Sequence, residues 1–215
     1  MTQKERQENS KREIFRAAME EFGTKEYETV TMEGICAGHK ISKGMMYHYY
    51  SNKDQLFLLC VADTFQKVKE YVEQATDGQR ANTFEAIQHF FLLRERYFEH
   101  HPLEKNVFEN AMIHPPKHLA RQITQLHQPL QQLNRDFLRQ VISHMQLRPG
   151  LSPADVASYL ECVAPVFPTF VHQRQEQKTA NTHSMLCAAE QVLQMILYGV
   201  VQEQPETMGS KSGPL

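Results

Sequence analysis

The sequence lacks the features of secreted and membrane-spanning proteins. No apolar run approaches the roughly 20 residues that a helix needs to cross a bilayer, and the polar N-terminus does not have the pattern of a signal peptide. The four cysteines stand far apart without a CxxC pair, and nothing indicates a disulfide framework. We therefore expect a cytoplasmic protein without membrane contact, whose cysteines are small buried hydrophobic side chains.

Signatures of catalysis and of metal binding are also missing. The sequence has no GxSxG, P-loop or GxGxxG motif. Among its eleven histidines, His114 and His118 are four residues apart, but Pro115 and Pro116 lie between them and disfavour a helical pair. No Cys or carboxylate stands at a spacing that would complete a metal site. We predict no enzymatic activity, no cofactor and no metal site.

The charge of the whole chain does not indicate nucleic-acid binding. The formal net charge at pH 7 is −2, and the first 53 residues carry nine Lys or Arg against eight Asp or Glu. Any attraction to DNA must therefore be local, from the N-terminal arm and from individual helix faces.

One stretch, residues 31–53, has the pattern of two short helices joined by a tight turn. Each helix start has a hydroxyl residue as N-cap, an apolar residue before it and another at the fourth helical position, which is the hydrophobic-staple arrangement. These residues are Thr31 with Val30 and Ile35, and Ser42 with Ile41 and Met46. Gly38-His39-Lys40 lies between the helices, and Lys40 must adopt a left-handed backbone unless Gly38 shifts the turn. The stretch predicts a helix-turn-helix.

The second of these helices, expected from about Lys43 to Tyr50, has an inward and an outward face. Met46 and Tyr50 are four residues apart and can pack inward. The outward residues are Lys43, Gly44, Tyr47 and His48. Glycine in the first turn lets another surface approach the backbone closely, and the free N–H groups of a helix start suit a phosphate. These outward residues are unusual for a helix face that meets only solvent.

The same stretch resembles the tetracycline-repressor (TetR) family of bacterial transcription regulators. The resemblance covers roughly residues 10 to 60. It is carried by Ile14, Ala17, Ala18, Phe22, Gly23, Val30, Ile35 and the run ISKGMMYHYYSNKDQL from Ile41 to Leu56. It implies an all-α fold, with an N-terminal three-helix helix-turn-helix head that binds DNA and a C-terminal helical body that binds a ligand and forms the dimer.

The resemblance also implies which residues contact double-stranded operator DNA. The predicted set comprises the family positions matched by Thr31, Ser42, Lys43, Gly44, Tyr47, His48 and Lys53, together with Met45 and Tyr49 of the same helix. We expect Tyr47 and His48 to lie where base edges can be read. We expect Lys43 and Lys53 to meet phosphates.

The chain divides by pattern into a head at residues 1–52, a body at 53–203 and a disordered tail at 204–215. Ser10 and Glu13 form a capping-box pattern for the first helix, which ends near Gly23, although its start could lie nearer Lys4. A helix from about Lys53 to Asp77 would be about 38 Å long at 1.5 Å per residue. It is the only predicted element long enough to contact both the head and the body.

The rest of the body predicts helices and no strands. We expect helices from Asn82 to His100, from about Leu103 to Ile113, across residues 119–141 with a kink at Pro129, from Ser152 with bends at Pro165 and Pro168, and across residues 182–203. The last of these has an apolar stripe too wide for one contact face. We predict that this stripe, which contains Ile196 and Val200, forms a two-fold dimer interface.

The aromatic and Met residues of the body have two interpretations. They can be ordinary core, or they can line an apolar ligand cavity. For the second case we predict a wall formed by Phe91, Phe98, Met112, Tyr159 and Phe167. The sequence thus favours a homodimeric, ligand-responsive repressor. The alternative is a helical small-molecule binding protein without a functional operator, and retention on specific DNA separates the two.

Overall fold

The computed structural model of the chain describes residues 2–76, 84–143, 145–163 and 195. Its elements are all helices, which confirms the predicted all-α fold. The helices are α1 (Gln3–Phe22), α2 (Met32–His39), α3 (Lys43–Tyr49), α4 (Lys53–Thr76), α5 (Phe84–His100), α6 (Pro102–Met112), α7 (Ala120–Ile142) and α8 (Pro153–Val163), with short 3-10 turns η1 (Tyr27–Thr29) and η2 (Lys117–Leu119). Within the described ranges, no helix is long and apolar enough to cross a membrane.

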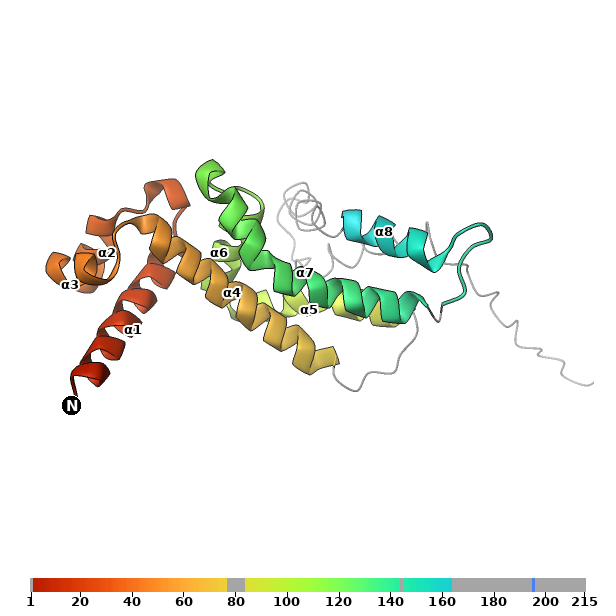
Figure 1. Cartoon of the computed structure of the whole chain (residues 1–215), viewed down its shortest axis with the longest axis horizontal. Coiled ribbons are helices and arrows are strands. Elements are labelled where there is room, and N and C mark those ends of the chain that lie inside the picture. Colours follow the sequence, from red (N-terminus) through yellow and green to blue (C-terminus); the bar gives the residue numbers. More distant parts are fainter. Residues whose placement is uncertain (1, 77–83, 144, 164–194, 196–215) are drawn as a thin grey trace, which may run out of the picture.

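The helices form an elongated molecule with the head at one end (Figure 1). Helices α1 to α3 make the head, and α4 runs out of the head into the body. In the body, α4 packs against α5, α6 and α7, and α8 packs against α7. The long α4 therefore connects the two parts, as the sequence predicts.

The first helix begins earlier than its Ser10 capping pattern suggests. Thr2 and Glu5 form the capping box, in which the Glu5 N–H donates to Thr2 Oγ1 at 3.2 Å and the Thr2 N–H donates to Glu5 Oε2 at 2.8 Å. Both pairs have the same pattern, and the intervening residues are mostly good helix formers. The helix therefore extends to the outer pair.

The helix-turn-helix forms as predicted. Thr31 Oγ1 accepts the N–H of Gly34 at 3.0 Å, and Ser42 Oγ accepts the N–H of Met45 at 3.1 Å. Lys40 adopts the left-handed conformation at φ 56° and ψ 30°. Among the described residues other than glycine, Lys40 alone has a positive φ.

The head and the start of α4 share one core. The Phe57 ring of α4 lies 5.1 Å from the ring of Phe22 at the end of α1 and 4.9 Å from that of Tyr27 in η1. Ile14, Ile35 and Met46 contribute one fully buried side chain each from α1, α2 and α3. Because α1 packs on α4 and also on α2 and α3, a tilt of α4 must move the head.

Helix α7 continues through Pro129 as a single element, as predicted. Figure 1 shows it changing direction along its length. Proline removes one helical hydrogen bond, which permits such a bend. The start of α8 also matches the sequence, because the Ser152 hydroxyl accepts the N–H of Asp155 at 3.2 Å.

One prediction about the cysteines is wrong, and several other predictions concern residues that the structure does not describe. Cys36 and Cys60 are buried as expected, whereas Cys162 is exposed at the end of α8, so the buried prediction is wrong for that residue. The bends at Pro165 and Pro168, the helix at 182–203 and the tail at 204–215 lie outside the described residues.

Candidate nucleic-acid interface

The outward face of α3 is open. Lys43, Gly44, Tyr47 and His48 are all exposed, and Tyr47 keeps 48% of its surface accessible. A Cβ placed on Gly44 would meet no atom within 4 Å. The backbone of the first turn can therefore be approached closely by another surface.

The N-caps leave donors for a phosphate at the start of α2 and of α3. The hydroxyl oxygens of Thr31 and Ser42 accept backbone N–H groups, so each keeps its O–H as a donor. The remaining first-turn N–H groups also point outward from the helix start. An anion that settles there meets these donors together with the ammonium of Lys43.

Glu33 of α2 positions two residues of α3. Its Oε1 accepts the Tyr47 hydroxyl at 3.1 Å and lies 3.9 Å from Lys43 Nζ. A backbone hydrogen bond and then the bond from Tyr47 lower the pKa of Glu33, and the same bond raises the pKa of Tyr47. Sequence reasoning missed Glu33, because no local pattern places a side chain of α2 against two side chains of α3.

Two of the predicted DNA-contacting residues are half-buried. Met45 and Tyr49 pack against the head core. The Tyr49 ring is 4.7 Å from the ring of His48, and Lys11 Nζ lies 6.0 Å from its centre. Their position indicates support for the exposed residues of α3 more than a direct contact with bases.

The phosphate contact predicted for Lys53 stays a prediction, and the structure shows which partners its side chain has in the chain itself. Its ammonium donates hydrogen bonds to three backbone carbonyl oxygens of the segment between α1 and α2. The acceptors are Tyr27, Glu28 and Val30, at 2.9, 3.3 and 3.0 Å. The ammonium also lies 4.3 Å from the centre of the Tyr27 ring. Since a lysine has three donors, Lys53 is fully used in fixing this segment to α4.

A polar cluster joins the head to the body at the start of α4. The Tyr27 hydroxyl of η1 donates a short hydrogen bond to Asp54 of α4. His118 of η2 contributes Nε2, which lies 3.1 Å from Asp54 Oδ2 and 3.3 Å from the Tyr27 hydroxyl oxygen. Burial and the Asp54 carboxylate both raise the pKa of Tyr27, which therefore stays protonated and donates. One residue from the head, one from α4 and one from the body meet here.

Helix α6 is a second connection between the parts. Asn106 Nδ2 donates to the carbonyl oxygen of Gly23 at 2.7 Å, and Asn110 Nδ2 donates to that of Lys25 at 3.3 Å. A Cβ on Gly23 would lie 2.7 Å from Leu103 Cβ, so α6 touches the end of α1 directly. The expectation that α4 alone contacts both parts is therefore wrong. The contacts of α6 are far apart in sequence and leave no periodic pattern.

The N-terminal stretch is similar to known regulators. Residues 14–60 match the family described as bacterial regulatory proteins, tetR family. The matched residues contain most of α1, the helix-turn-helix and the start of α4, so the similarity to this family is concentrated in the head.

The TetR-type fold extends through the body. The ketosteroid transcriptional regulator KstR2 of Mycobacterium tuberculosis superposes with a TM-score of 0.61 at 19% identity, covering 89% of this chain and 94% of that one. A TetR family transcriptional regulator from Chloroflexus aurantiacus J-10-FL gives 0.61 at 16% identity, covering 91% and 95%. The flavonoid-responsive regulator FrrA gives 0.53 at 16%, covering 91% and 99%. At these identities the likeness shows the fold. No curated protein matches this chain significantly.

The predicted ligand wall is only partly described. Phe98 is buried and its ring lies 5.0 Å from that of Phe108, and Met112 is half-buried. Tyr159 is 43% exposed on α8. The Phe91 side chain and all of Phe167 lie outside what the structure describes. That the described members of this set line a ligand cavity therefore stays a prediction.

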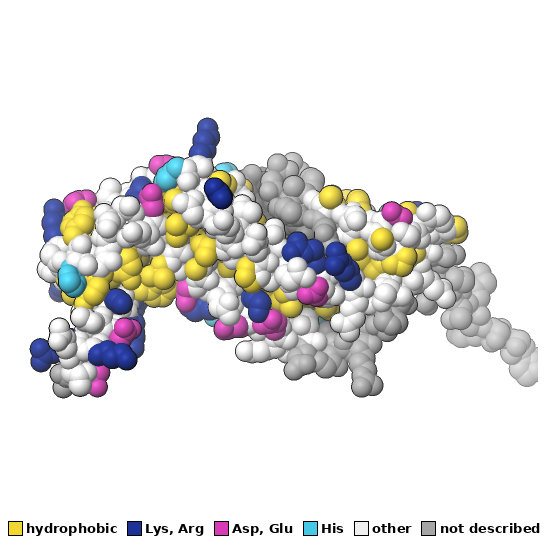
Figure 2. All heavy atoms as spheres, in the orientation of Figure 1, with side chains coloured by type: hydrophobic (Ala, Val, Ile, Leu, Met, Phe, Trp, Pro, Cys, Tyr) yellow, Lys and Arg dark blue, Asp and Glu magenta, His cyan; other side chains and the backbone are white. Residues whose placement is uncertain are grey.

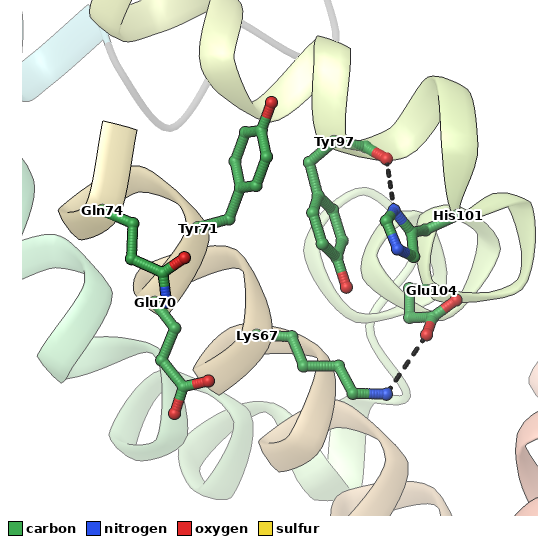
Figure 3. Close-up of a pocket in the computed structure, with 7 residues that line it drawn as sticks. All are labelled: Lys67, Glu70, Tyr71, Gln74, Tyr97, His101 and Glu104. Carbon is green, nitrogen blue, oxygen red and sulfur yellow. Dashed lines mark hydrogen bonds and ion pairs between the residues drawn. The ribbon is translucent and has the colours of Figure 1, made fainter. Parts of the chain in front are cut away.

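A polar groove of about 250 Å³ lies between α4, α5 and α6 (Figure 3). Its lining residues are Lys67, Glu70, Tyr71, Gln74, Tyr97, His101 and Glu104, none of which belongs to the predicted wall. Lys67 Nζ lies 2.9 Å from Asp63 and 3.3 Å from Glu104. The His101 Nδ1 lies 2.7 Å from the carbonyl oxygen of Tyr97. Most charges of the groove thus already have partners.

Proposed function

We propose that this chain is a TetR-family regulator, a sequence-specific, ligand-responsive repressor that binds operator DNA as a homodimer. The observation that carries the DNA part is the open α3 face, where the bare backbone of Gly44 lies beside exposed Lys43, Tyr47 and His48. A face of this kind admits a duplex to close contact, and its aromatic and imidazole groups can reach base edges in a major groove.

Each group on this face has a distinct task. The helix start at Ser42 and the ammonium of Lys43 bind phosphates and fix the register. Tyr47 and His48 read bases. Glu33 orients the phenol of Tyr47 through the 3.1 Å hydrogen bond. Lys43 Nζ lies 3.9 Å from the same carboxylate oxygen, which is a long distance for an ion pair. Lys43 can therefore leave Glu33 and bind a phosphate.

Dimerisation sets the spacing of two such heads. Two α3 helices must enter successive major grooves, about 34–36 Å apart or a multiple of that distance. We place the two-fold interface on the apolar stripe of residues 182–203, and charge introduced at Ile196 or Val200 is expected to disrupt it. Sedimentation of the wild-type chain as a monomer at micromolar concentration contradicts this assembly.

Ligand response requires that the body and the head move together. Helices α4 and α6 both contact the head, so a ligand that favours one packing of the body also favours one head position. The fold is shared with the flavonoid-responsive regulator FrrA, which supports a small-molecule effector for this chain. Repression is released if the ligand-bound head position no longer matches the groove spacing.

The test is selection of a binding site from random duplex DNA by the full-length protein. We expect enrichment of a sequence with two related half-sites. If no sequence is enriched over the starting pool, the chain is instead a helical small-molecule binding protein without an operator. Tyr47→Phe should weaken specific binding more than non-specific binding, since it removes a base-reading hydroxyl and keeps the phosphate contacts.

Lys43 and Lys53 form a matched pair for the same experiment. Lys43→Ala should reduce the dependence of binding on salt by about one unit of slope, because one phosphate contact is lost. Lys53→Ala should leave that slope unchanged and lower the stability of the head, because its ammonium serves three carbonyl groups. The reverse pattern would assign the phosphate contact to Lys53.

A further inference from the structure

In the described part of the chain, the interior between α5 and α7 contains two side-chain nitrogen atoms that are buried without a hydrogen-bond partner. Arg94 of α5 is 7% exposed, and its Nη2 is buried without a hydrogen bond. His127 of α7 is 5% exposed, and its Nε2 is likewise buried without a partner. Charged and polar groups in protein interiors are normally paired or hydrogen-bonded. Two exceptions this close to each other need an explanation.

The carboxylate next to Arg94 in sequence does not neutralise it. Glu95 follows Arg94 on α5, so its side chain points about 100° away around the helix. It is 8% exposed, and burial is the main cause of its raised pKa, which disfavours its charged form. Glu95 is nevertheless the group whose negative charge acts on Arg94. Among the described residues, the guanidinium therefore lies opposite a carboxylate whose charged form is disfavoured by burial.

The surroundings of the two groups are aromatic. Phe90 and Phe98 lie four residues before and after Arg94, on the same face of α5, and both are buried. The Phe90 ring stacks on Phe137 of α7 at 3.9 Å. The Phe65 ring of α4 lies 5.0 Å from the ring of His127. A ligand that meets Arg94 here meets hydrocarbon on its other sides.

We propose that Arg94 and His127 bind the acid group of a monocarboxylate ligand whose apolar part lies among these aromatic side chains. The proposal rests on the ligand response proposed above and names the chemical class of the effector. The Nη2 of Arg94, which lacks a partner, can donate a charge-assisted hydrogen bond to one carboxylate oxygen. The imidazole of His127 can add a second bond from Nε2–H in the corresponding tautomer.

The charge balance favours a single negative charge. Burial, and then the Arg94 charge, lower the pKa of His127 to about 4, so the imidazole is neutral at pH 7. One guanidinium then matches one carboxylate. A phosphate monoester with two charges would leave one of them buried without a counter-charge.

The experiment uses matched probes on the full-length protein without DNA. The dissociation constants of decanoate and 1-decanol, and of 2-naphthoate and 2-naphthol, are measured by isothermal titration calorimetry. We expect the acid to bind about tenfold or more tightly than the alcohol in at least one pair, as a hydrogen bond to a charged group commonly provides. If neither acid binds more tightly than its alcohol, the proposal is overturned.

Two variants test whether Arg94 causes the preference. Arg94→Met should remove the preference for the acid. It should not lower the melting temperature of the ligand-free protein, because it replaces an unpaired buried charge by an apolar side chain of similar length. Arg96→Met is the control, since Arg96 is exposed on the same helix and should leave the preference intact. An acid preference that survives Arg94→Met refutes the site.

The outcomes separate this site from the proposed repressor function. Binding of the acids is measured in the absence of DNA, so a chain without an operator can still show the preference. If the wild-type protein binds operator DNA but shows no preference for the acids, the carboxylate site is rejected and the repressor function stays in place.

Discussion

Polar groups are exposed on the α3 face of the head, whereas two of them are buried in the interior of the body. Side chains of Lys, Arg, Asp and Glu are visible on the surface of the head (Figure 2). Lys43, Tyr47 and Glu33 are exposed there and either contact each other or face solvent. In the body, Arg94 and His127 are buried and unpartnered. The polar groups of the head face thus have partners or solvent, whereas the described body keeps buried nitrogen atoms without hydrogen-bond partners. Under the proposed function, DNA would meet a surface whose polar groups are already satisfied, and an effector would satisfy the groups left open in the interior.

A third region, the junction between the head and the body, resembles neither. At the junction, Lys53, Asn106 and Asn110 donate to backbone carbonyl groups of the head, and Tyr27, Asp54 and His118 bond to one another. Its polar groups are paired across elements. The junction can therefore transmit a change in the body only by moving as a unit or by exchanging these partners.

The largest expected effect comes from breaking the junction at Gly23. An added Cβ would lie 2.6 Å from the Met19 carbonyl oxygen of α1, 2.7 Å from Leu103 Cβ and 2.8 Å from Leu103 Cα, so the end of α1 and its contact with α6 must both shift. Gly23→Ala should cost about 1–3 kcal/mol of unfolding free energy, which is the usual range for overpacking. Denaturant unfolding followed by circular dichroism measures this loss.

Gly38→Ala is the matched control for that variant. A Cβ on Gly38 would meet only Glu21 Oε1 at 3.5 Å, an ordinary contact, and alanine is the better helix former. It should leave stability unchanged or raise it. Equal losses in both variants would mean that the contact of α6 with Gly23 does not hold the head.

The next effect concerns the buried imidazole and is a dependence on pH. The pKa of His127 is lowered to about 4 in the folded chain, from a usual value near 6.5, so the unfolded chain binds more protons between these values. Stability contributed by the neutral imidazole is present above about pH 6.5 and is lost as the pH falls toward 4. Between pH 7 and pH 5 the loss should be about 2 kcal/mol.

Denaturant unfolding at these two pH values, for the wild type and for His127→Leu, isolates the contribution of His127. The variant keeps all other titrating groups, so its stability should fall less over the same interval. If the two proteins lose the same free energy, His127 is not held neutral by the interior.

A smaller effect on stability is expected on the recognition face. Gly44→Ala places a methyl group where no atom lies within 4 Å, so the folded head is not strained. It should raise the unfolding free energy by up to about 1 kcal/mol, because alanine favours the helix. It should lower operator affinity, since the methyl group stands between the backbone and the duplex. Unchanged operator affinity would show that this backbone is not approached closely.

The head could be predicted from the sequence because its main features depend on local patterns. The caps at Thr31 and Ser42 and the left-handed Lys40 depend on residues within a few positions of one another. Such local patterns can be recognised without knowledge of the tertiary contacts. The structure has both caps as predicted, and of the two turn geometries considered it has the left-handed Lys40. The same holds for Ser152 at the start of α8.

What the sequence could not show depends on residues that are distant in the chain. The role of Lys53 depends on carbonyl groups more than twenty residues earlier, and the Asn106 contact with Gly23 spans 83 residues. The isolated position of Arg94 is equally invisible, because periodicity marks apolar faces and does not say which polar residue is buried. The groove lined by Tyr97 and Lys67 was missed for the same reason.

The central claim is that the body and the head respond to one another, and reciprocal coupling tests it most directly. Operator affinity is measured with and without a saturating carboxylate that binds the body, and affinity for that carboxylate is measured with and without saturating operator. The account predicts that each partner weakens the other by the same factor, as linkage requires. A carboxylate that binds through Arg94 and leaves operator affinity unchanged would contradict it.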